Sequence, residues 1–201
     1  GSPVKSLSIV KSKTNGQISS IDSIAENMLI YQRAIGGWPK AVNEIKVDYT
    51  KQLTETEKKA IIADSLHIDP TIDNGATTKE IKYLVTAYKK TKNNKYLAAA
   101  EKGIGYLLKA QYATGGWPQY FPDFSSYRSQ ITYNDDAMVN VLNLLQDIVE
   151  GARNFDMVNP AFIPKAKVAI ELGVGCILRT QIKVNGKIGR ASCRERVSSP
   201  V

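Results

Sequence analysis

The sequence has 201 residues, of which 43% are hydrophobic and 23% are charged. This composition suits one folded domain with a hydrophobic core, and it excludes a disordered chain, a collagen-like repeat and, because no apolar run approaches about 18 residues, a membrane span. The net charge of +8 leaves nucleic acid, acidic lipid and acidic polysaccharide open as polyanionic partners.

Apolar residues recur at helical spacing in several stretches, and capping residues precede some of them. The predicted helices cover residues 20–33, 55–66, 77–92, 95–111, 135–150 and a last helix that begins near Pro160 or Pro164 and ends at about Gln181. Thr54 and Glu57 predict a capping box at the second helix, and Ser19 with Asp22 makes a weaker capping pair at the first. Because no stretch shows the alternation typical of strands, we predict an all-α protein.

Two motifs recur along these helices. The first is a Gln at a helix end followed by a glycine-rich turn, as in Gln32 with Gly36-Gly37-Trp38-Pro39, Gln111 with Gly115-Gly116-Trp117-Pro118, and Gln181 with Asn185-Gly186. The second opens helices, as Thr71-Ile72-Asp73-Asn74-Gly75-Ala76 and Thr132-Tyr133-Asn134-Asp135-Asp136-Ala137. Since an α/α toroid alternates two kinds of helix, the repeats predict a toroid whose inner helices begin at one shared pole.

The second motif would collect oxygen ligands at this pole, namely Asp73, Asn74, Asp135 and Asp136. Oxygen ligands without Cys or His favour a hard cation such as Ca²⁺. Asp and Asn at helix starts are also common N-caps. Adjacent carboxylates, however, repel one another unless a cation or a proton relieves them. Helix capping and metal binding therefore both remain open for these residues.

Side chains that follow the Gly-Gly-Trp-Pro turns are candidates for binding a sugar chain. Trp117 and Tyr120, with Arg128 in the long loop behind them, could form the floor of a groove. The alternative for Trp117 is structural, with its ring wedged between helix ends. Lys40 and Gln119 hold the same place after Trp-Pro in the two repeats. Either side chain could reach a ligand carboxylate or simply be solvated.

A run of lysines lies in the middle of the chain, and the favoured interpretation is a solvated helix face. It comprises Lys79, Lys82, Lys89, Lys90, Lys92 and Lys95. No nucleic-acid recognition motif accompanies it, so we predict no nucleic-acid partner.

Several motifs together point to one known family. They are Ala25-Glu26-Asn27-Met28-Leu29, Gly36-Gly37-Trp38-Pro39-Lys40, Thr71-Ile72-Asp73-Asn74-Gly75-Ala76-Thr77-Thr78, Gly115-Gly116-Trp117-Pro118-Gln119, Ile131-Thr132-Tyr133-Asn134-Asp135-Asp136-Ala137-Met138-Val139-Asn140 and Cys176-Ile177-Leu178. From about residue 20 to 188, the sequence closely resembles the pectate lyases of polysaccharide lyase family ten. This resemblance implies an (α/α)3 toroid, in agreement with the repeats.

The resemblance also implies calcium-dependent cleavage of polygalacturonate by β-elimination. Asp73 and Asp135 match acidic residues that serve the metal and the substrate, so they are the expected catalytic residues. The expected metal ligands are Asp73, Asn74, Asp135 and Asp136, and the expected substrate-binding residues are Lys40, Trp117, Gln119, Tyr120 and Arg128. The family's base is an arginine. A secreted or periplasmic location, and a monomer when the toroid is complete, are further expectations.

The resemblance suggests three segments: an N-terminal extension over residues 1–19, an incomplete toroid without its C-terminal helices over 20–187, and a non-native tail over 188–201. After Lys187-Ile188 the family motif reads Thr-Ala-Trp-Cys-Ala-Gln-His-Asp, whereas this chain continues with a string that resembles a translated sequencing adapter. Ser129-Gln130 also replaces the Asp-His of the family. We therefore expect this chain to be an inactive or weak lyase. The alternative is a non-catalytic module that binds acidic polysaccharide.

Overall fold

The computed structural model describes residues 10–14, 17–133, 136–180, 183–184 and 187–188. Its helices are α1 (Ser23–Tyr31), α2 (Glu55–Ala63), α3 (Thr78–Thr91), α4 (Asn94–Ala110), α5 (Ala137–Glu150) and α6 (Phe162–Thr180), with short 3-10 turns η1 (Asp73–Gly75), η2 (Ser126–Ser129) and η4 (Phe155–Met157). The all-α prediction is confirmed. Among the residues described, no helix is long and apolar enough to cross a membrane.

Three small antiparallel hairpins were not predicted. They pair β1 (Val10–Thr14) with β2 (Gln17–Ile21), β3 (Ala41–Val42) with β4 (Ile45–Lys46), and β5 (Lys183–Val184) with β6 (Lys187–Ile188). The first hairpin lies mostly in the segment expected to be an extension. The expected tail from residue 189 onward lies outside the described residues.

Capping side chains decide where the first two helices begin. Asp22, rather than Ser19, caps α1 by accepting hydrogen bonds from the backbone N–H groups of Ile24 and Ala25, both at 3.0 Å. The helix therefore begins at Ser23, three residues later than predicted. The predicted capping box of Thr54 at α2 is confirmed. At α3, by contrast, the N-cap residue Thr77 makes no capping hydrogen bond with its side chain.

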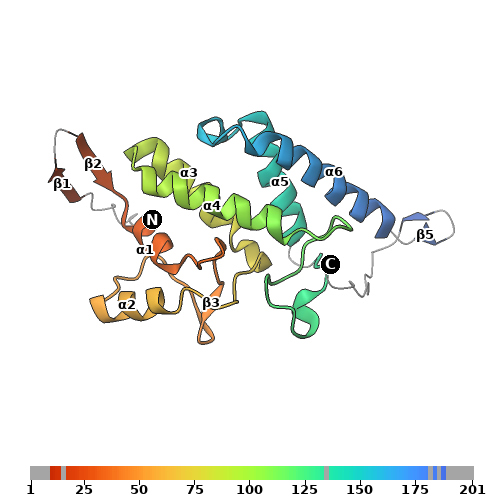
Figure 1. Ribbon diagram of the computed structural model, residues 1–201, viewed down its shortest axis with the longest axis horizontal. Helices are drawn as coiled ribbons and strands as arrows, with labels where there is room; N and C mark the ends of the chain where they lie inside the picture. The colour runs from red at the N-terminus through yellow and green to blue at the C-terminus, as the bar shows by residue number, and fades with distance from the viewer. Residues whose placement is uncertain (1–9, 15–16, 134–135, 181–182, 185–186, 189–201) are drawn as a thin grey trace, which may run out of the picture.

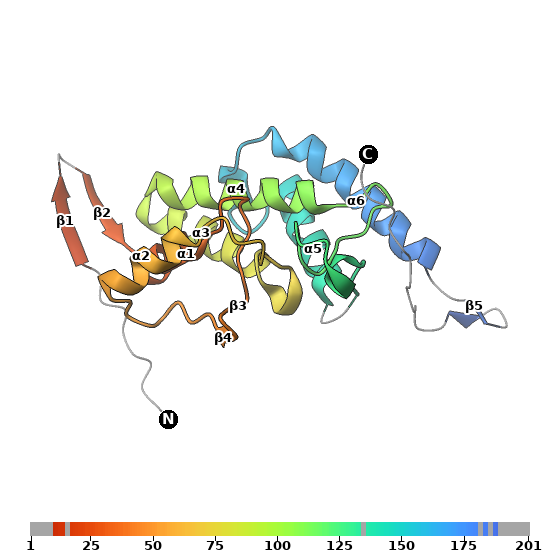
Figure 2. The same ribbon diagram turned by 60° about the horizontal axis from the view of Figure 1, so that its bottom comes forward.

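Helical hairpins form the body of the protein (Figure 1). α3 packs against α4 and α5 packs against α6, while further contacts join α3 to α5 and α4 to α6. Figure 2 shows this helical layer with β3 and β4 on one side of it. The two helices that follow the Thr-x-Asp/Asn motif, α3 and α5, are thus neighbours, and so are the outer helices α4 and α6. Successive hairpins of an α/α toroid require this arrangement.

The two complete Gln motifs make the same hydrogen bonds, which explains this packing of neighbouring helices. Gln32 Nε2 donates to the carbonyl oxygens of Gly36, at 2.8 Å, and of Ala99 in α4, at 2.9 Å. Gln111 Nε2 makes the equivalent bonds to Gly115, at 2.9 Å, and to Ala169 in α6, at 2.8 Å. Each Gln therefore ties its own turn to the next outer helix.

The tryptophans of the two turns have a structural role. Both rings are 0% exposed. Trp38 Nε1 donates to Met28 O at 2.7 Å, and Trp117 Nε1 donates to Leu107 O at 2.8 Å. Burial satisfies the indole N–H and fills the space between helix ends. The prediction that Trp117 contacts substrate is therefore corrected, because its buried ring presents no face to a ligand.

A buried arginine links the turn after α1 to the segment that leads to Thr71. Arg33 is 1% exposed and binds both carboxylate oxygens of Asp69, each at 2.8 Å. Its Nη1 also donates to Asp64 O at 2.8 Å. This geometry satisfies a charge that would otherwise be costly to bury.

Removal of this arginine is expected to destabilise the fold. Arg33→Met should lower the free energy of unfolding by about 3–5 kcal/mol, because it leaves the half-buried Asp69 carboxylate unpaired. Urea denaturation measures the effect, with Lys59→Met on exposed α2 surface as the control. A loss no larger than that of the control would contradict this role for Arg33.

Candidate active site

In each repeat the Trp-Pro turn lies beside the segment that leads into α3 or α5, on the side of the protein that carries the loops. The backbone N–H of Thr71 donates to Trp38 O at 3.1 Å, and that of Thr132 donates to Trp117 O at 3.0 Å. The same bond thus occurs in both repeats. It places the residues that follow Trp-Pro beside those that lead into α3 and α5.

Thr71 also fixes the backbone that carries Asp73. Its hydroxyl donates to Gln119 O at 2.5 Å and accepts from the Asp73 N–H at 3.0 Å. Asn74 follows with φ of 51°, in the left-handed region, where asparagine is better tolerated than most residues. The hydrogen bond from Thr71 to Gln119 O joins the two repeats directly at the predicted site. Gln119 supplies a backbone oxygen to this joint, and its side chain is half-buried.

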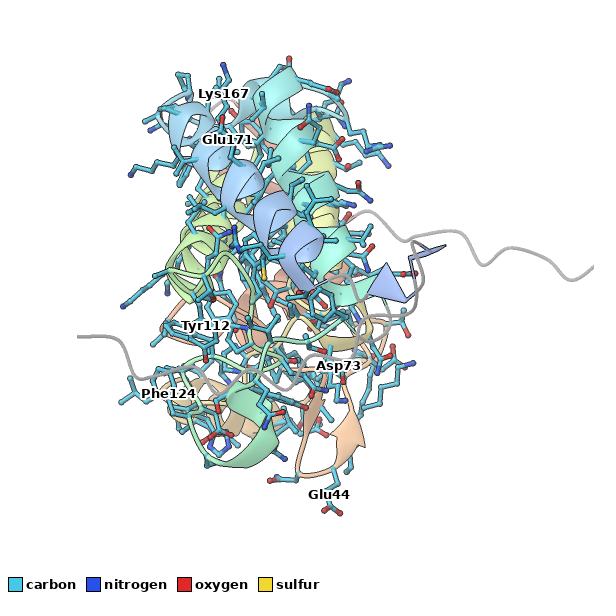
Figure 3. All side chains as sticks on the ribbon, turned by 90° about the vertical axis from the view of Figure 1, so that its right-hand side faces the viewer. Glu44, Asp73, Tyr112, Phe124, Lys167 and Glu171 are labelled. Atoms are coloured by element: carbon cyan, nitrogen blue, oxygen red, sulfur yellow. The ribbon has the colours of Figure 1, made fainter. Side chains whose placement is uncertain are left out.

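Asp73 lies in the 3-10 turn η1 and is 4% exposed (Figure 3). Its Oδ2 forms an ion pair with Lys40 Nζ. The hydrogen bond to Asp73 raises the pKa of Lys40, burial opposes this rise, and Tyr120 adds to it. The structure therefore brings together Asp73, Lys40 and Tyr120, each predicted separately as a site residue.

Arg128 extends this group of side chains. Its guanidinium carbon lies 4.8 Å from the centroid of the Tyr120 ring, within the range of a cation–π interaction. Its Nη1 lies 3.4 Å from Asp123 Oδ2. Lys40, Asp73, Tyr120 and Arg128 are referred to below as the Asp73 site. Both cations of this site are partly exposed, so a ligand can reach them.

Asp123 is a residue that sequence reasoning missed. Its Oδ1 accepts from the Ser125 N–H at 2.9 Å and from the Ser125 hydroxyl at 2.5 Å. Burial acts to raise the pKa of Asp123, but the hydrogen bonds from Ser125 and Arg128 outweigh it and lower the pKa. The carboxylate stays ionised and positions Arg128. The Asp-x-Ser sequence, typical of an Asx turn, was the available signal.

The predicted metal ligands are only partly described. Asp136 is exposed and precedes α5 in the left-handed conformation, with φ of 54°. Asp135 lies outside the described residues, so the expected shared pole of Asp73 and Asp135 stays a prediction. η1 does contact α5. Within the described part of the chain, no group of three or more His, Cys, Asp or Glu side chains could hold a metal.

The ligand chemistry nevertheless fits a hard cation at Asp73. The buried Asp73 carboxylate, which pairs with the ammonium group of Lys40, supplies oxygen ligands. Asn74 next to it is exposed and carries an amide oxygen. Oxygen ligands of this kind are those that Ca²⁺ prefers.

Glu80, in the first turn of α3, was not predicted as a buried group. It is 1% exposed, and its Oε1 accepts from the Tyr49 hydroxyl at 2.9 Å. Among the described residues its Oε2 has no hydrogen-bond partner. Burial raises the pKa of Glu80, against the opposing effects of Lys79 and Tyr49. The folded protein therefore holds the Glu80 proton more tightly than the unfolded chain does.

This difference predicts a pH dependence of stability. Because the folded state binds the extra proton, the free energy of unfolding should fall as the pH rises above the ordinary carboxyl value of 4.5 and towards the raised pKa. Glu80→Gln should remove this fall, since its amide oxygen can still accept from Tyr49. Urea denaturation between about pH 4 and pH 8 measures it. Glu55→Gln, at an exposed position, is the control, and parallel curves for wild type and Glu80→Gln would contradict the prediction.

Comparison with known proteins identifies the family. Residues 32–193 match the family model described as pectic acid lyase. The structure of a family 10 polysaccharide lyase from Cellvibrio cellulosa is similar, with 31% sequence identity and a TM-score of 0.69, over 83% of this chain and 48% of that chain. A mutant of a family 10 lyase from the same organism, in complex with trigalacturonic acid, is 30% identical with a TM-score of 0.69 and the same coverage.

This chain therefore belongs to the pectic acid lyase family. Its fold resembles that of the family 10 lyases, as the sequence resemblance implied. The chain spans about half the length of these solved structures, since it covers 48% of them. No curated protein matches it.

Proposed function

We propose that this chain is part of a pectate lyase that cleaves polygalacturonate by calcium-assisted β-elimination. The observation that carries the proposal is the Asp73 site of this family member, in which Lys40 pairs with the buried Asp73 carboxylate and interacts with Tyr120, whose ring lies under the Arg128 guanidinium. The complex of a similar lyase with trigalacturonic acid supports a galacturonate chain as the ligand. Because such a polymer lies outside cells, we include secretion in the proposal.

The chemistry of β-elimination explains why this site suits pectate. The proton that leaves C5 of galacturonate is α to a carboxylate, and its removal adds negative charge to that group. Bound Ca²⁺ would supply positive charge there. Asp73, Asn74, Asp135 and Asp136 would hold it, as oxygen ligands.

The other residues of the site would bind and orient the substrate. Lys40 and Arg128 offer an ammonium and a guanidinium group to uronate carboxylates, and Asp123 holds the guanidinium in place. The Tyr120 ring, which the Arg128 guanidinium lies over, offers its remaining apolar surface to a sugar ring. Gln119, beside Tyr120, could add a hydrogen bond. We assign no residue of this chain as the base.

The test is the ultraviolet absorbance of the 4,5-unsaturated uronide formed from polygalacturonate, measured with Ca²⁺ and with a chelator. We expect a slow absorbance increase that the chelator abolishes. An increase that persists in the chelator would contradict the calcium requirement. Binding of polygalacturonate without any unsaturated product would instead identify a non-catalytic polysaccharide-binding module.

A further inference from the structure

Lysine and threonine form one side of α3, where Lys79, Lys89 and Lys90 are exposed and Lys82 and Thr86 are half-buried. Lys79, Lys82, Thr86 and then Lys89 with Lys90 follow one another at intervals of three or four residues, so they share one side of the helix. Lys92 and Lys95 continue the series into α4. The sequence contains no Asp or Glu between Ile81 and Ala100. We call this set the α3 lysine row: Lys79, Lys82, Lys89, Lys90, Lys92 and Lys95.

Most lysines of this row lack the acidic partners that some other surface lysines of the described residues have. Elsewhere on the surface, Lys51 pairs with Glu57 at 2.7 Å and Lys58 pairs with Glu55 at 2.8 Å. Within the described residues, by contrast, the one ion pair of the row joins Lys79 to the buried Glu80, at 3.7 Å. The row is therefore a surface of largely uncompensated positive charge.

The side chains that contact these lysines from neighbouring positions do not neutralise their positive charge. Lys89 binds the Asn154 side chain at 2.6 Å, and Lys92 lies 5.5 Å from the Tyr88 ring centroid, so both contact uncharged partners. Asp147 on the adjacent α5 is buried and bound by Arg153 at 2.7 Å.

The α3 lysine row starts close to the Asp73 site in the sequence and extends away from it along α3. η1, which carries Asp73, ends three residues before α3 begins at Thr78. Lys79 lies in the first turn of α3 and Lys90 in its last. At a rise of 1.5 Å per residue these two lysines are about 17 Å apart along the helix. Figure 1 shows α3 running away from the loop-rich side to its turn with α4. The row thus leads away from the Asp73 site.

We propose that the α3 lysine row binds the part of a polygalacturonate chain that extends beyond the Asp73 site. The inference rests on the proposed function and deepens it, because it makes long polyuronates the preferred substrate. A regular polyanion meets successive ammonium groups along the row, and the binding of several charges releases bound counterions. A trigalacturonate that occupies the Asp73 site gains nothing from the distant lysines.

The test compares two triple variants of equal charge. Lys82→Gln/Lys89→Gln/Lys90→Gln removes the centre of the row, and Lys59→Gln/Lys165→Gln/Lys167→Gln removes exposed lysines of α2 and α6. Fluorescence anisotropy with end-labelled polygalacturonate gives the affinity at several salt concentrations, and calorimetry gives the affinity for trigalacturonate. We expect the row variant to bind the polymer roughly tenfold more weakly with a shallower salt dependence, and the control to change less than about twofold. Neither variant should change trigalacturonate affinity.

Equal losses in the two variants, or no loss in the row variant, would overturn the inference. If Asp73→Asn abolishes trigalacturonate binding while the row variant binds the polymer normally, the inference fails and the proposed function stands. If wild type binds neither ligand, both fail. A DNA oligonucleotide of matched charge that binds the row more tightly than polygalacturonate would assign the row to nucleic acid and overturn the proposal.

Discussion

Gly115→Ala is expected to lower the free energy of unfolding by more than about 4 kcal/mol. Gly115 has φ of 96°, a conformation that side chains with a Cβ rarely adopt. A Cβ there would lie 2.0 Å from Leu172 O and 2.5 Å from Leu172 C, both backbone atoms of α6. Because the Gln111 bonds hold this turn against α6, the turn cannot move away without breaking them.

Gly105→Ala is the matched control for this prediction. Gly105 lies within α4, and a Cβ there would meet no atom within 4 Å. Its substitution should stabilise the protein by about 0.5–1 kcal/mol, because alanine has the higher helix propensity. Urea or thermal unfolding compares the two variants. Similar stabilities would contradict the close approach of the turn to α6.

Asp73→Asn is expected to weaken Ca²⁺ binding by roughly 100-fold. The substitution removes one carboxylate charge, which is a main determinant of calcium affinity, and leaves the size of the side chain almost unchanged. Titration calorimetry with Ca²⁺ alone measures the effect. Asp48→Asn is the control, since Asp48 is exposed and its carboxylate binds Thr50 within its own loop. An unchanged affinity in Asp73→Asn would remove Asp73 from the proposed metal site.

The helices and their repeat could be predicted because their signals are local. Apolar spacing and the Thr54 capping box placed the start of α2 correctly, although the helix ends at Ala63 and not at residue 66, and the recurring Gln32 and Gln111 make the same bonds in the structure. The β3–β4 hairpin was missed for an equally local reason. Its turn residues Asn43 and Glu44 both have positive φ, 51° and 64°, as in a type I′ turn, but the usual glycine is absent.

The sequence predicted individual residues of the site, but it did not predict how they contact one another. Lys40 and Asp73 were both singled out, yet their ion pair joins positions 33 residues apart through folding. For Trp117 the sequence left substrate binding and a structural role open, and the structure shows the structural role, because the ring is buried and its N–H donates to Leu107 O. Glu80 was missed since a charged residue in a lysine-rich helix gives no sign of burial.

The central claim, that Asp73 and its partners bind a galacturonate chain together with Ca²⁺, is tested most directly by titrating the protein with trigalacturonate in a calorimeter. We expect saturable one-site binding in the presence of Ca²⁺ and a loss of at least about tenfold in affinity when a chelator replaces it. Binding of equal affinity with and without Ca²⁺, or no binding in either condition, would contradict the account.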